Sequence, residues 1–545
     1  MDLLTLVLQV TATLVALFLV YYMRRLRTNM SNNVRKGLDQ APEPKGAWPI
    51  IGHLHLLGGR APIFRVLAVM ANNLGPVFTI RIGMRRALVV SSREAVMECF
   101  TTNDRAFLSR PKTVALKYMG YGGAMSALGP HGSLWHKLRK VTTLELLSNS
   151  RLELLKNVRS LEVELCIKEL YSKCMKHPCS VPVRLDNHSA NGVDDIIAST
   201  CTTKVDMAQW FRLVTMNLML RVIVGRRYCL TDDEKYGEAR RFTTLMDEFM
   251  YLTGVFEFSN VIPHIEWMDL QGHVRSMKRN AKDMDYFMSK WLEEHIQSRK
   301  NDKMKVGGDF VDALLNLFPE DGVEFGHKNE NIIKATSLAL IMAGTDTTAA
   351  SMTWALSLLL NHKKCLKIVQ EEVDLHVGRK RWVEESDMEN LVYLQAVVKE
   401  ALRLYPPGPL LIPREAIEDC YVAGYYVPKG THLLVNAWKL HRDSRVWDKP
   451  CEFRPERFLM RQARPNAWEQ QFEYLPFSFG RRSCPGMTAA YQMIHLVLAR
   501  VLQGFAFETP MDAPIDMTEG LGLTLPKAMP LEVLLSLRLP YKLYM

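Results

Sequence analysis

The segment FSFGRRSCPG, residues 477–486, concentrates residue types that turn a cysteine into a strong metal ligand. A cysteine binds metal as a thiolate, and nearby positive charge and backbone N–H groups lower its pKa. Two arginines precede Cys484, and the helix predicted for residues 487–505 directs its first N–H groups back toward the sulfur. Gly480 permits a tight turn, and Gly486 lets the chain approach a flat ligand closely. A turn that merely buries a cysteine needs none of these charges.

This segment resembles the haem-binding signature of cytochromes P450, F-x-x-G-x-R-x-C-x-G. The five fixed positions of the signature are occupied by Phe477, Gly480, Arg482, Cys484 and Gly486. The resemblance implies that haem b is the cofactor and that these residues bind it. It also implies that Cys484 is the axial ligand of the haem iron and that Arg482 pairs with a haem propionate. A thiolate ligand pushes electron density onto iron and favours O–O cleavage.

A second pattern, AGTDTT at residues 343–348, lies inside a long helical run. Small and polar residues recur every four positions, where an ordinary core helix would carry Leu or Ile: Ala339, Ala343, Thr347 and Ser351. On its own, such a stripe also suits a close contact between two helices. With the haem signature, it resembles the P450 helix on the distal face of haem. The resemblance implies that Ala343 and Gly344 border the haem, with Gly344 opening the helix for O2. It also implies that Asp346 and Thr347 are the catalytic pair that carries protons.

The motif KEALR, residues 399–403, places Glu400 and Arg403 one helical turn apart, which suits an ion pair. Alone, such a pair is more typical of a solvated helix surface. The later segment FRPERF, residues 453–458, changes this interpretation because P450s join an E-x-x-R helix to the arginine of a P-E-R-F segment. The resemblance therefore implies that Glu400, Arg403 and Arg457 form a buried structural triad behind the haem.

The motif WHKLR, residues 135–139, puts an indole N–H and a guanidinium on one face of a helix. In P450s these residues meet a haem propionate, which assigns Trp135 and Arg139 to cofactor binding. The family's contact after the E-x-x-R helix falls on Arg414. Guanidinium groups suit buried carboxylates because their contacts can be bidentate. Further basic residues leave a positive face for an electron donor; they are Lys137, Lys140 and Arg481. The resemblance implies NADPH-cytochrome P450 reductase as this donor, with cytochrome b5 as a second candidate.

The elements that must position these motifs are mainly helices. Strand patterns occur at residues 77–92 and 424–438, and the VPKG within the second is typical of a turn between strands. We therefore predict a mainly α protein with the cytochrome P450 fold, in which a large helical domain with small β-sheets holds haem between distal and proximal helices. The polar segment at residues 180–201 is typical of a surface loop.

Residues 3–22 form an uncharged run of 20 positions, the length that crosses a bilayer as a helix. Basic residues follow this run and only Asp2 precedes it, so the positive-inside rule places the rest of the chain in the cytosol. We predict a membrane anchor (1–23), a basic stretch with a Pro-rich hinge (24–58) and a cytosolic haem-thiolate catalytic domain (59–545). The chain would then be a single-pass protein of the endoplasmic reticulum membrane. A cleaved signal peptide and a peripheral helix are the alternatives.

The formal net charge of +11 is spread along 545 residues rather than gathered in a tail, and no nucleic-acid motif accompanies it. Nucleic-acid binding is therefore not expected, and the charge suits a membrane or an acidic protein partner. The ten cysteines include no CxxC pair, so neither a disulfide framework nor a zinc site is expected.

Along almost its whole length the chain is similar to plant microsomal P450s of family 82, for example in APEPKGAWPIIGHLHLLGG and AGTDTTAASMTWALSLLLNH. The resemblance implies a monooxygenase that inserts one atom of O2 into a small apolar plant metabolite, using electrons from NADPH. An aromatic alkaloid of the benzylisoquinoline type is the leading substrate class, while a terpenoid, a lignan or a flavonoid remains open. A haem-thiolate isomerase or dehydratase and a haem-binding sensor fit the intact cysteine loop and the distal threonine less well. Four segments are expected to line the substrate pocket: 109–128, 339–347, 406–412 and 521–525.

Overall fold

The computed structural model describes most of the chain: residues 39–59, 61–176, 203–228, 233–262, 265–301, 308–462 and 472–545, with scattered positions between 9 and 22. Of the predicted anchor only those scattered positions are described, and the polar segment predicted as a loop, 180–201, lies outside the described residues. Within the described part, no helix combines the length and the apolar character needed to cross a membrane.

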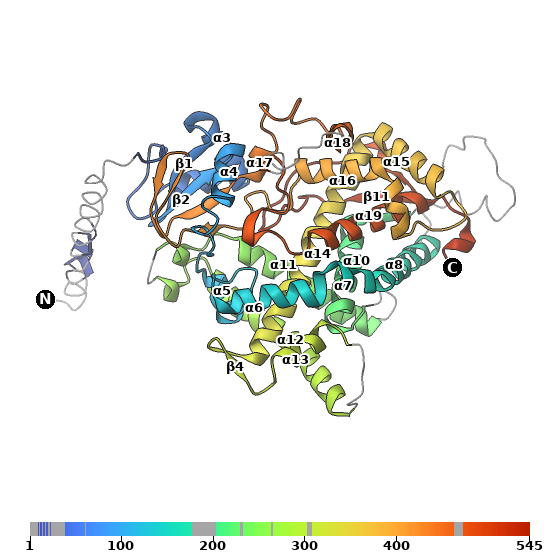
Figure 1. The fold of residues 1–545 in the computed structure, drawn as a ribbon, viewed down its shortest axis with the longest axis horizontal. Helices are drawn as coiled ribbons and strands as arrows, with labels where there is room; N and C mark the ends of the chain where they lie inside the picture. The colour runs from blue at the N-terminus through green and yellow to red at the C-terminus, as the bar shows by residue number, and fades with distance from the viewer. Residues whose placement is uncertain are drawn as a thin grey trace.

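Helices dominate the described chain, as the sequence predicts (Figure 1). The helical body contains α5 (Val114–Met119), α6 (Ser133–Thr142), α7 (Asn149–Leu154), α8 (Lys156–Lys176), α10 (Met207–Val224), α11 (Asp233–Gly254), α12 (His273–Asn301), α13 (Phe310–Leu317), α14 (Asn329–Asn361), α15 (Lys363–His376), α16 (Val392–Leu404), α18 (Glu456–Gln462) and α19 (Met487–Gly504). Four more helices lie in the part of the molecule that carries the largest sheet: α2 (Leu54–Leu57), α3 (Ile63–Leu74), α4 (Arg93–Phe100) and α17 (Ala437–Leu440).

The core is organised around α14, whose residues are buried on every side along most of its length. A helix that is apolar all round must be enclosed by other elements, and α10, α12, α13, α15, α16 and α19 pack against it. Its contact with α10 is close because Gly344 has no side chain: a Cβ there would come within 2.5 Å of the Met219 sulfur. The Thr215 hydroxyl of α10 also donates to the Thr345 carbonyl at 3.1 Å. We infer that α10 and α14 form one rigid unit.

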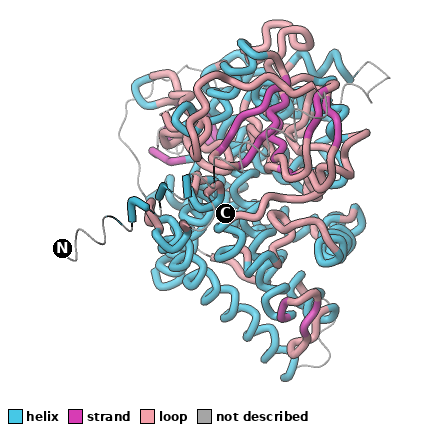
Figure 2. The backbone as a smooth tube through the Cα atoms, turned by 90° about the vertical axis from the view of Figure 1, so that its left-hand side faces the viewer, coloured by secondary structure: helices cyan, strands magenta, loops and turns pink. Residues whose placement is uncertain are grey.

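Most strands lie in the upper part of the view in Figure 2, whereas the β4–β5 hairpin lies apart at the lower end. The largest sheet has the order β1 (Val77–Ile82), β2 (Arg85–Val90), β9 (His432–Val435), β6 (Arg414–Glu415). Within it, β1 and β2 are antiparallel, β2 and β9 are parallel, and β9 and β6 are antiparallel. The other strands form a three-stranded antiparallel sheet and two hairpins, in the orders β10 (Phe505–Glu508), β11 (Glu532–Leu537), β3 (Thr203–Asp206); β4 (Val323–Glu324), β5 (His327–Lys328); and β7 (Cys420–Val422), β8 (Tyr425–Val427).

Both predicted strand regions contain strands. In the second region, at residues 424–438, the two strands do not pair with each other as they would in a simple hairpin. The region at residues 77–92 forms the β1–β2 hairpin. The VPKG turn does lie between strands, yet β8 before it pairs with β7 while β9 after it pairs with β2. The turn therefore connects two sheets. Local patterning identifies a strand, whereas its neighbour is decided by tertiary packing.

The described part of the Pro-rich segment packs along the edge of β1. The Thr79 N–H donates to the Pro42 carbonyl at 2.8 Å, and the His53 N–H donates to the Arg81 carbonyl at 2.7 Å. The buried His53 ring also lies 2.9 Å from the Pro44 carbonyl oxygen through Nε2. Residues 42–53 are thus attached to the largest sheet.

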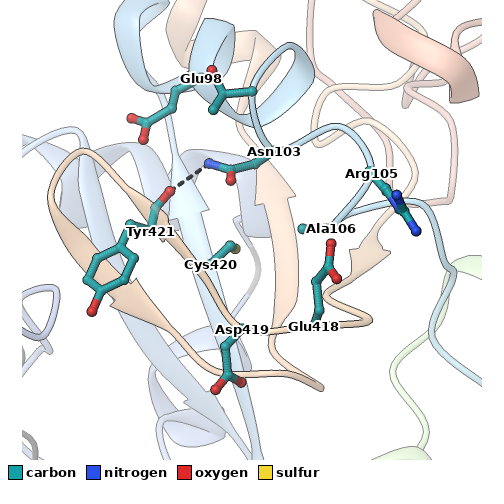
Figure 3. Close-up of a pocket in the computed structure, with 9 residues that line it drawn as sticks. Glu98, Asn103, Arg105, Ala106, Glu418, Asp419, Cys420 and Tyr421 are labelled. Carbon is teal, nitrogen blue, oxygen red and sulfur yellow. Dashed lines mark hydrogen bonds between the residues drawn. The ribbon is translucent and has the colours of Figure 1, made fainter.

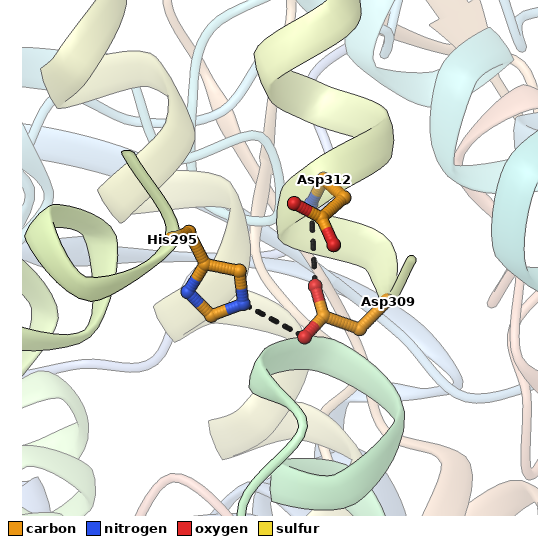
Figure 4. A group of neighbouring side chains, drawn as sticks. All are labelled: His295, Asp309 and Asp312. Carbon is orange, nitrogen blue, oxygen red and sulfur yellow. Dashed lines mark hydrogen bonds and ion pairs between the residues drawn. The ribbon is translucent and has the colours of Figure 1, made fainter. Parts of the chain in front are cut away.

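A charged cluster joins the end of α12 to the start of α13 (Figure 4). The Asp309 carboxylate caps α13 by accepting the Asp312 N–H at 3.2 Å, and its other oxygen lies 2.8 Å from His295 Nε2. The other ring nitrogen, Nδ1, lies 2.6 Å from the Trp291 carbonyl oxygen. Burial lowers the pKa of His295, but the hydrogen bond and charge of Asp309 outweigh it, so the pKa is raised above its usual 6.5. Because both ring nitrogens face acceptors, the cluster is explained as an ion pair that fixes the α12–α13 corner.

This ion pair predicts a pH-dependent contribution to stability. A histidine whose pKa is higher in the folded state stabilises the fold below its unfolded pKa, and the contribution is lost as the pH rises through the folded value. We expect His295→Gln to lower the unfolding temperature more near pH 6 than near pH 9, by about 1 °C per kcal/mol lost in a chain of this length. Replacing the exposed His376 of α15 by Gln is the matched control. A deficit for His295→Gln that is equal at both pH values would contradict the assignment.

Candidate functional site

The cysteine loop, residues 477–486, turns tightly before α19. The Cys484 N–H donates to the Phe477 carbonyl at 2.9 Å, and the Ser483 N–H donates to the Gly480 carbonyl at 3.0 Å. Gly480 has a φ of +76°, and a side chain there would collide with the Asp104 carboxylate. A glycine is therefore required at this position by both conformation and space. At Gly486, by contrast, a Cβ would only reach ordinary contact with the Cys484 sulfur, at 3.9 Å.

Cys484 lies directly before α19 with an exposed side chain, unlike the buried cysteines of the core. Desolvation by the surrounding protein raises the pKa of its thiol, although the Gly486 N–H and the Arg139 guanidinium act in the opposite direction. The N–H group and the positive charge thus act in the direction that the sequence predicts, and desolvation opposes them. A bound metal cation changes this balance because a coordinating thiol is deprotonated outright.

Three guanidinium groups surround the cysteine loop. Arg139 donates to the Ser483 carbonyl at 2.7 Å. Arg482 donates through Nε to the Leu108 carbonyl at 2.8 Å, and its guanidinium lies 4.2 Å from the centre of the Trp135 ring. Its two terminal nitrogens are buried and have no hydrogen-bond partner. Burial, together with the charges of Arg414 and Arg139, lowers the pKa of Arg482 to about 9. Unpartnered buried donors of this kind are the recognition groups for an anion.

Arg414 is engaged differently. It donates to Asp104 at 3.2 Å, to the Ser478 hydroxyl at 3.3 Å and to the Phe479 carbonyl at 2.7 Å. The buried Asp104 also accepts the Arg481 N–H at 3.2 Å. Asp104 and Arg414 therefore support the cysteine loop from behind.

A surface hollow of about 440 Å³ is lined by Asn103 and Arg105, the sequence neighbours of Asp104 (Figure 3). It is formed by the end of α4 and the β7–β8 hairpin, where Asn103 donates to the Tyr421 carbonyl at 2.6 Å. Its lining includes the acidic residues Glu98, Glu418 and Asp419 but not Cys484. This hollow is not part of the candidate site.

The AGTDTT segment forms an opening in the otherwise buried surface of α14. Ala343 is exposed and Thr347 is half-buried, although Met342 and Thr348 beside them are buried. The Thr347 hydroxyl donates to the Ala343 carbonyl at 2.6 Å. The open side of Gly344 faces Met219 of α10. The small residues thus serve both a helix–helix contact and an exposed face, which the sequence presented as alternatives.

Asp346 has partners that the sequence did not indicate. Its carboxylate accepts the Thr524 hydroxyl, and its other oxygen lies 3.4 Å from the guanidinium of Arg212 in α10. Among the described hydrogen bonds, none joins Asp346 to Thr347. The two residues are neighbours in sequence, but their side chains point to different partners.

Glu400, Arg403 and Arg457 meet in the core between α16 and α18. Arg403 donates to the two oxygens of Glu400 at 2.7 and 2.8 Å, and Arg457 donates to Glu400 at 3.0 Å. The side chains of Glu400 and Arg403 are completely buried. Remaining donors of Arg403 are used by the carbonyls of His441 and Pro450, both at 2.7 Å. This fully hydrogen-bonded ion pair holds the chain on either side of it in place.

The face predicted for an electron donor is basic but smaller than expected. Lys140 and Arg481 are exposed. Lys137 is half-buried, forms an ion pair with Glu324 and lies 4.3 Å from the centre of the Phe318 ring. The Lys137 ammonium group is therefore already paired with Glu324 and contributes less to a face that binds an electron donor.

The sequence profile of the cytochrome P450 family matches residues 42–532 of the chain. The chain belongs to the cytochrome P450 family. This P450 is 46% identical over 513 residues to the xanthotoxin 5-hydroxylase CYP82C4 of Arabidopsis thaliana, covering 93% of this chain and 94% of the relative. It is 43% identical to the vinorine hydroxylase of Rauvolfia serpentina, with both chains covered completely, and 45% identical to the flavonoid-6-hydroxylase of Ocimum basilicum, with 92% of each chain covered. The solved structure of a zebrafish P450 with progesterone superposes with a TM-score of 0.69 at 25% identity, covering 88% of this chain and 100% of that one.

These findings identify the chain as a plant P450 of family 82 and a monooxygenase whose relatives hydroxylate specialised metabolites. Haem is its cofactor, and O2 and NADPH-derived electrons are its co-substrates. A redox partner reductase and a small organic substrate follow from family membership. The structure fits haem independently, because an exposed cysteine and a buried arginine with two unpartnered nitrogens adjoin one loop. That donor set suits a metal-bearing ligand with carboxylates.

Sequence reasoning missed Asp104, Arg212 and Met219, and it placed Thr524 in a predicted pocket wall but not beside Asp346. Each touches a motif residue from a distant part of the chain, and none belongs to a motif of its own. A single acidic residue or threonine carries no sequence signal that distinguishes it from a solvated one.

Proposed function

We propose that this P450 hydroxylates an aromatic alkaloid, with a compound of the benzylisoquinoline type as the leading candidate. The proposal rests on the arrangement of Cys484 beside the unpartnered nitrogens of Arg482, which provides for haem, and on two relatives. The vinorine hydroxylase and the strychnine-10-hydroxylase of Strychnos nux-vomica are named for alkaloids, and their alignments cover 97–100% of this chain. A flavonoid is the second candidate because relatives of similar identity are named for flavonoid and xanthotoxin hydroxylation. Terpenoids and lignans remain further alternatives.

In this proposal Cys484 would hold the haem iron through its thiolate. Haem held by a thiolate supplies the activation of O2 for the insertion of one oxygen atom. Arg482 binds a propionate through its two unpartnered nitrogens, and Trp135 and Arg139 complete the same contact. Arg414 acts mainly through Asp104 and the loop carbonyl of Phe479 rather than on a propionate.

The remaining loop and helix residues shape the space around the cofactor. Phe477 accepts the Cys484 N–H through its carbonyl, and Gly480 allows the loop to pass Asp104. Gly486 leaves the approach beneath the sulfur open. On α14, the exposed Ala343 borders the haem, and Gly344 brings α10 close to that point of the helix.

Asp346 and Thr347 are assigned to proton delivery. The half-buried Asp346 exchanges protons with solvent at its carboxylate oxygens, while the Thr347 hydroxyl orients a proton-donating water at the exposed face of α14. The apolar residues of the predicted pocket segments exclude bulk water from this face. Glu400, Arg403 and Arg457 have a structural role only.

The assignment of Arg482 predicts a defect in cofactor binding. We expect Arg482→Gln to raise the haem dissociation constant about tenfold, because one charge-assisted contact to a propionate is lost. Haem content and the carbon monoxide difference spectrum of the reduced protein measure this. Arg481→Gln, at the neighbouring and exposed position, is the control and should keep its haem. Cys484→Ser should lose the thiolate Soret band, and its retention would refute the ligand assignment.

The substrate class is tested with a metabolite panel. Microsomes containing this P450, the reductase and NADPH are supplied with benzylisoquinoline alkaloids, vinorine, strychnine, xanthotoxin, flavones, terpenoids and lignans. We expect an alkaloid to gain one oxygen atom, detected by mass spectrometry, with the highest kcat/KM of the panel. A higher kcat/KM for a flavone or for xanthotoxin would replace the alkaloid by the second candidate.

We also infer attachment to the endoplasmic reticulum membrane through the apolar residues 3–22, with residues 24–58 as the connection and 59–545 as the cytosolic catalytic domain. Exposed apolar side chains on two neighbouring parts of the fold support this: Trp48, Ile63, Val69, Trp267 and Leu270. The two parts meet where the Met84 N–H donates to the Val261 carbonyl at 3.1 Å. The reductase, and cytochrome b5 as a second partner, would dock on the face that carries Lys140 and Arg481.

Membrane attachment is tested by extraction of microsomes with alkaline carbonate, which removes peripheral proteins. We expect the full chain to stay with the membrane and a chain lacking residues 1–23 to be released in part, since the exposed apolar surface alone binds reversibly. Complete release of the full chain would contradict a spanning anchor.

A further inference from the structure

Arg212 of α10 lies between two carboxylates that belong to different helices. Its guanidinium contacts Asp247 of α11 through one terminal nitrogen and lies 3.4 Å from Asp346 of α14 through the other. The contact with Asp247 is the closer of the two, and the contact with Asp346 is at the limit of a hydrogen bond. Arg212 Nε is buried without a partner, so the position of the guanidinium depends on these two carboxylates.

The charges of this cluster do not balance. One cation serves two carboxylates, of which Asp247 is 55% exposed and Asp346 is 17% exposed. Desolvation raises the pKa of Asp247, as does the charge of Asp346, while Arg212 lowers it. The two carboxylates thus compete for the guanidinium.

The backbone of Arg212 is fixed relative to Asp346 but not relative to Asp247. Helices α10 and α14 are joined by the Gly344–Met219 contact and by the Thr215–Thr345 hydrogen bond. Helix α11 packs chiefly on α12 and α5, and one turn before Asp247 it touches α10 through the Thr243 hydroxyl, which donates to the Met216 sulfur at 3.5 Å. A displacement of α11 would therefore carry Asp247 away from Arg212 and leave Arg212 beside Asp346.

The C-terminal end of α11 is in contact with the loop that supplies the other partner of Asp346. A Cβ on Gly254 would collide with the backbone nitrogen of Leu523, so α11 is seated directly on this loop. The next residue, Thr524, donates its hydroxyl to Asp346. The loop segment 521–525 is also one of the predicted walls of the substrate pocket. A substrate that displaces this wall or α11 can therefore move both residues that contact Asp346, which are Thr524 and Arg212.

Building on the proposed proton-delivery role of Asp346, we propose that Arg212 is a positioning residue for this carboxylate and that Asp247 controls it. When α11 is seated on the loop, Asp247 holds the guanidinium and Asp346 is free to exchange protons with water. When α11 is displaced, Arg212 turns to Asp346 and holds it as an ion pair. The position of a helix seated on a predicted wall of the substrate pocket thereby sets the rate of proton delivery.

The proposal is tested by Asp247→Asn, Arg212→Gln and the double variant. Asparagine cannot hold the guanidinium by charge, so Arg212 should pair with Asp346 in Asp247→Asn. NADPH and O2 would then yield more H2O2 in place of hydroxylated product and water. We expect the H2O2 formed per NADPH to rise about three- to tenfold and the solvent isotope effect in D2O to increase. The probe is the panel compound with the highest turnover.

The double variant separates positioning from a general loss of structure. With Arg212 also replaced by Gln, the inhibiting cation is gone, so H2O2 formation should return to the level of Arg212→Gln alone. A defect in the double variant at least as large as in Asp247→Asn would overturn the proposal. Asp283→Asn, which removes another ion pair of α11 through Arg241, is the matched control and should leave the ratio of product to H2O2 unchanged.

A second readout needs no substrate. The coupling between Arg212 and Asp346 is measured from unfolding temperatures in a double-mutant cycle of Arg212→Gln and Asp346→Asn. We expect this coupling to be larger in the Asp247→Asn background than in the native chain, and equal values would refute the competition. All variants should keep the thiolate Soret band with carbon monoxide. Loss of that band in the native chain itself would count against the proposed function rather than against the role of Arg212.

Discussion

Arg482 keeps its guanidinium beneath the surface with both terminal nitrogens unpartnered, and Arg139 and Arg414 stand close enough to lower its pKa. Burying several positive charges beside one loop is unfavourable unless anions compensate them. The protein itself supplies one buried anion, Asp104, and uses it to bind Arg414 and the backbone of Arg481. The remaining positive charge is left for the carboxylates of the cofactor. Asp104 and the loop carbonyls hold Arg414 and Arg139 in place when no ligand is bound.

The fold separates parts that must stay still from parts that can respond. Helices α10 and α14 are joined by contacts that leave no space for a side chain at Gly344, and Glu400 and Arg403 are fixed by a completely buried ion pair. By contrast, α11 packs mainly on α12 and α5, and it is linked to the active region through Asp247 and through its end at Gly254. Chemistry that is common to the family depends on the fixed helices α10 and α14 and on the buried ion pair. Adaptation to a particular substrate can be accommodated by changes in α11.

The sequence contained enough information to predict the local elements and the residues that meet at the site. Short-range spacing places Glu400 and Arg403 on one face of a helix, whereas the meeting of this pair with Arg457 was implied by the resemblance to cytochromes P450. The sheet neighbours on either side of VPKG could not be predicted, since strand pairing is a long-range property. Asp104 and Arg212 were also beyond reach, because their importance comes only from what they touch. The raised pKa of the Cys484 thiol shows the same limit: desolvation depends on packing, which the neighbouring residues in the sequence do not report.

The contacts of the cysteine loop have a further consequence for how the protein is made. Asp104 binds Arg414 and the Arg481 backbone across 310 and 377 positions of the chain, and Arg482 is held by the Leu108 carbonyl across 374. Contacts between such distant residues form late because a long loop must close first. Asp104 and Leu108 are synthesised long before the residues that they contact. The loop therefore cannot reach its final structure until residues 477–486 have left the ribosome. Cofactor insertion is therefore expected to follow translation, and until then the partly folded chain must be protected from aggregation.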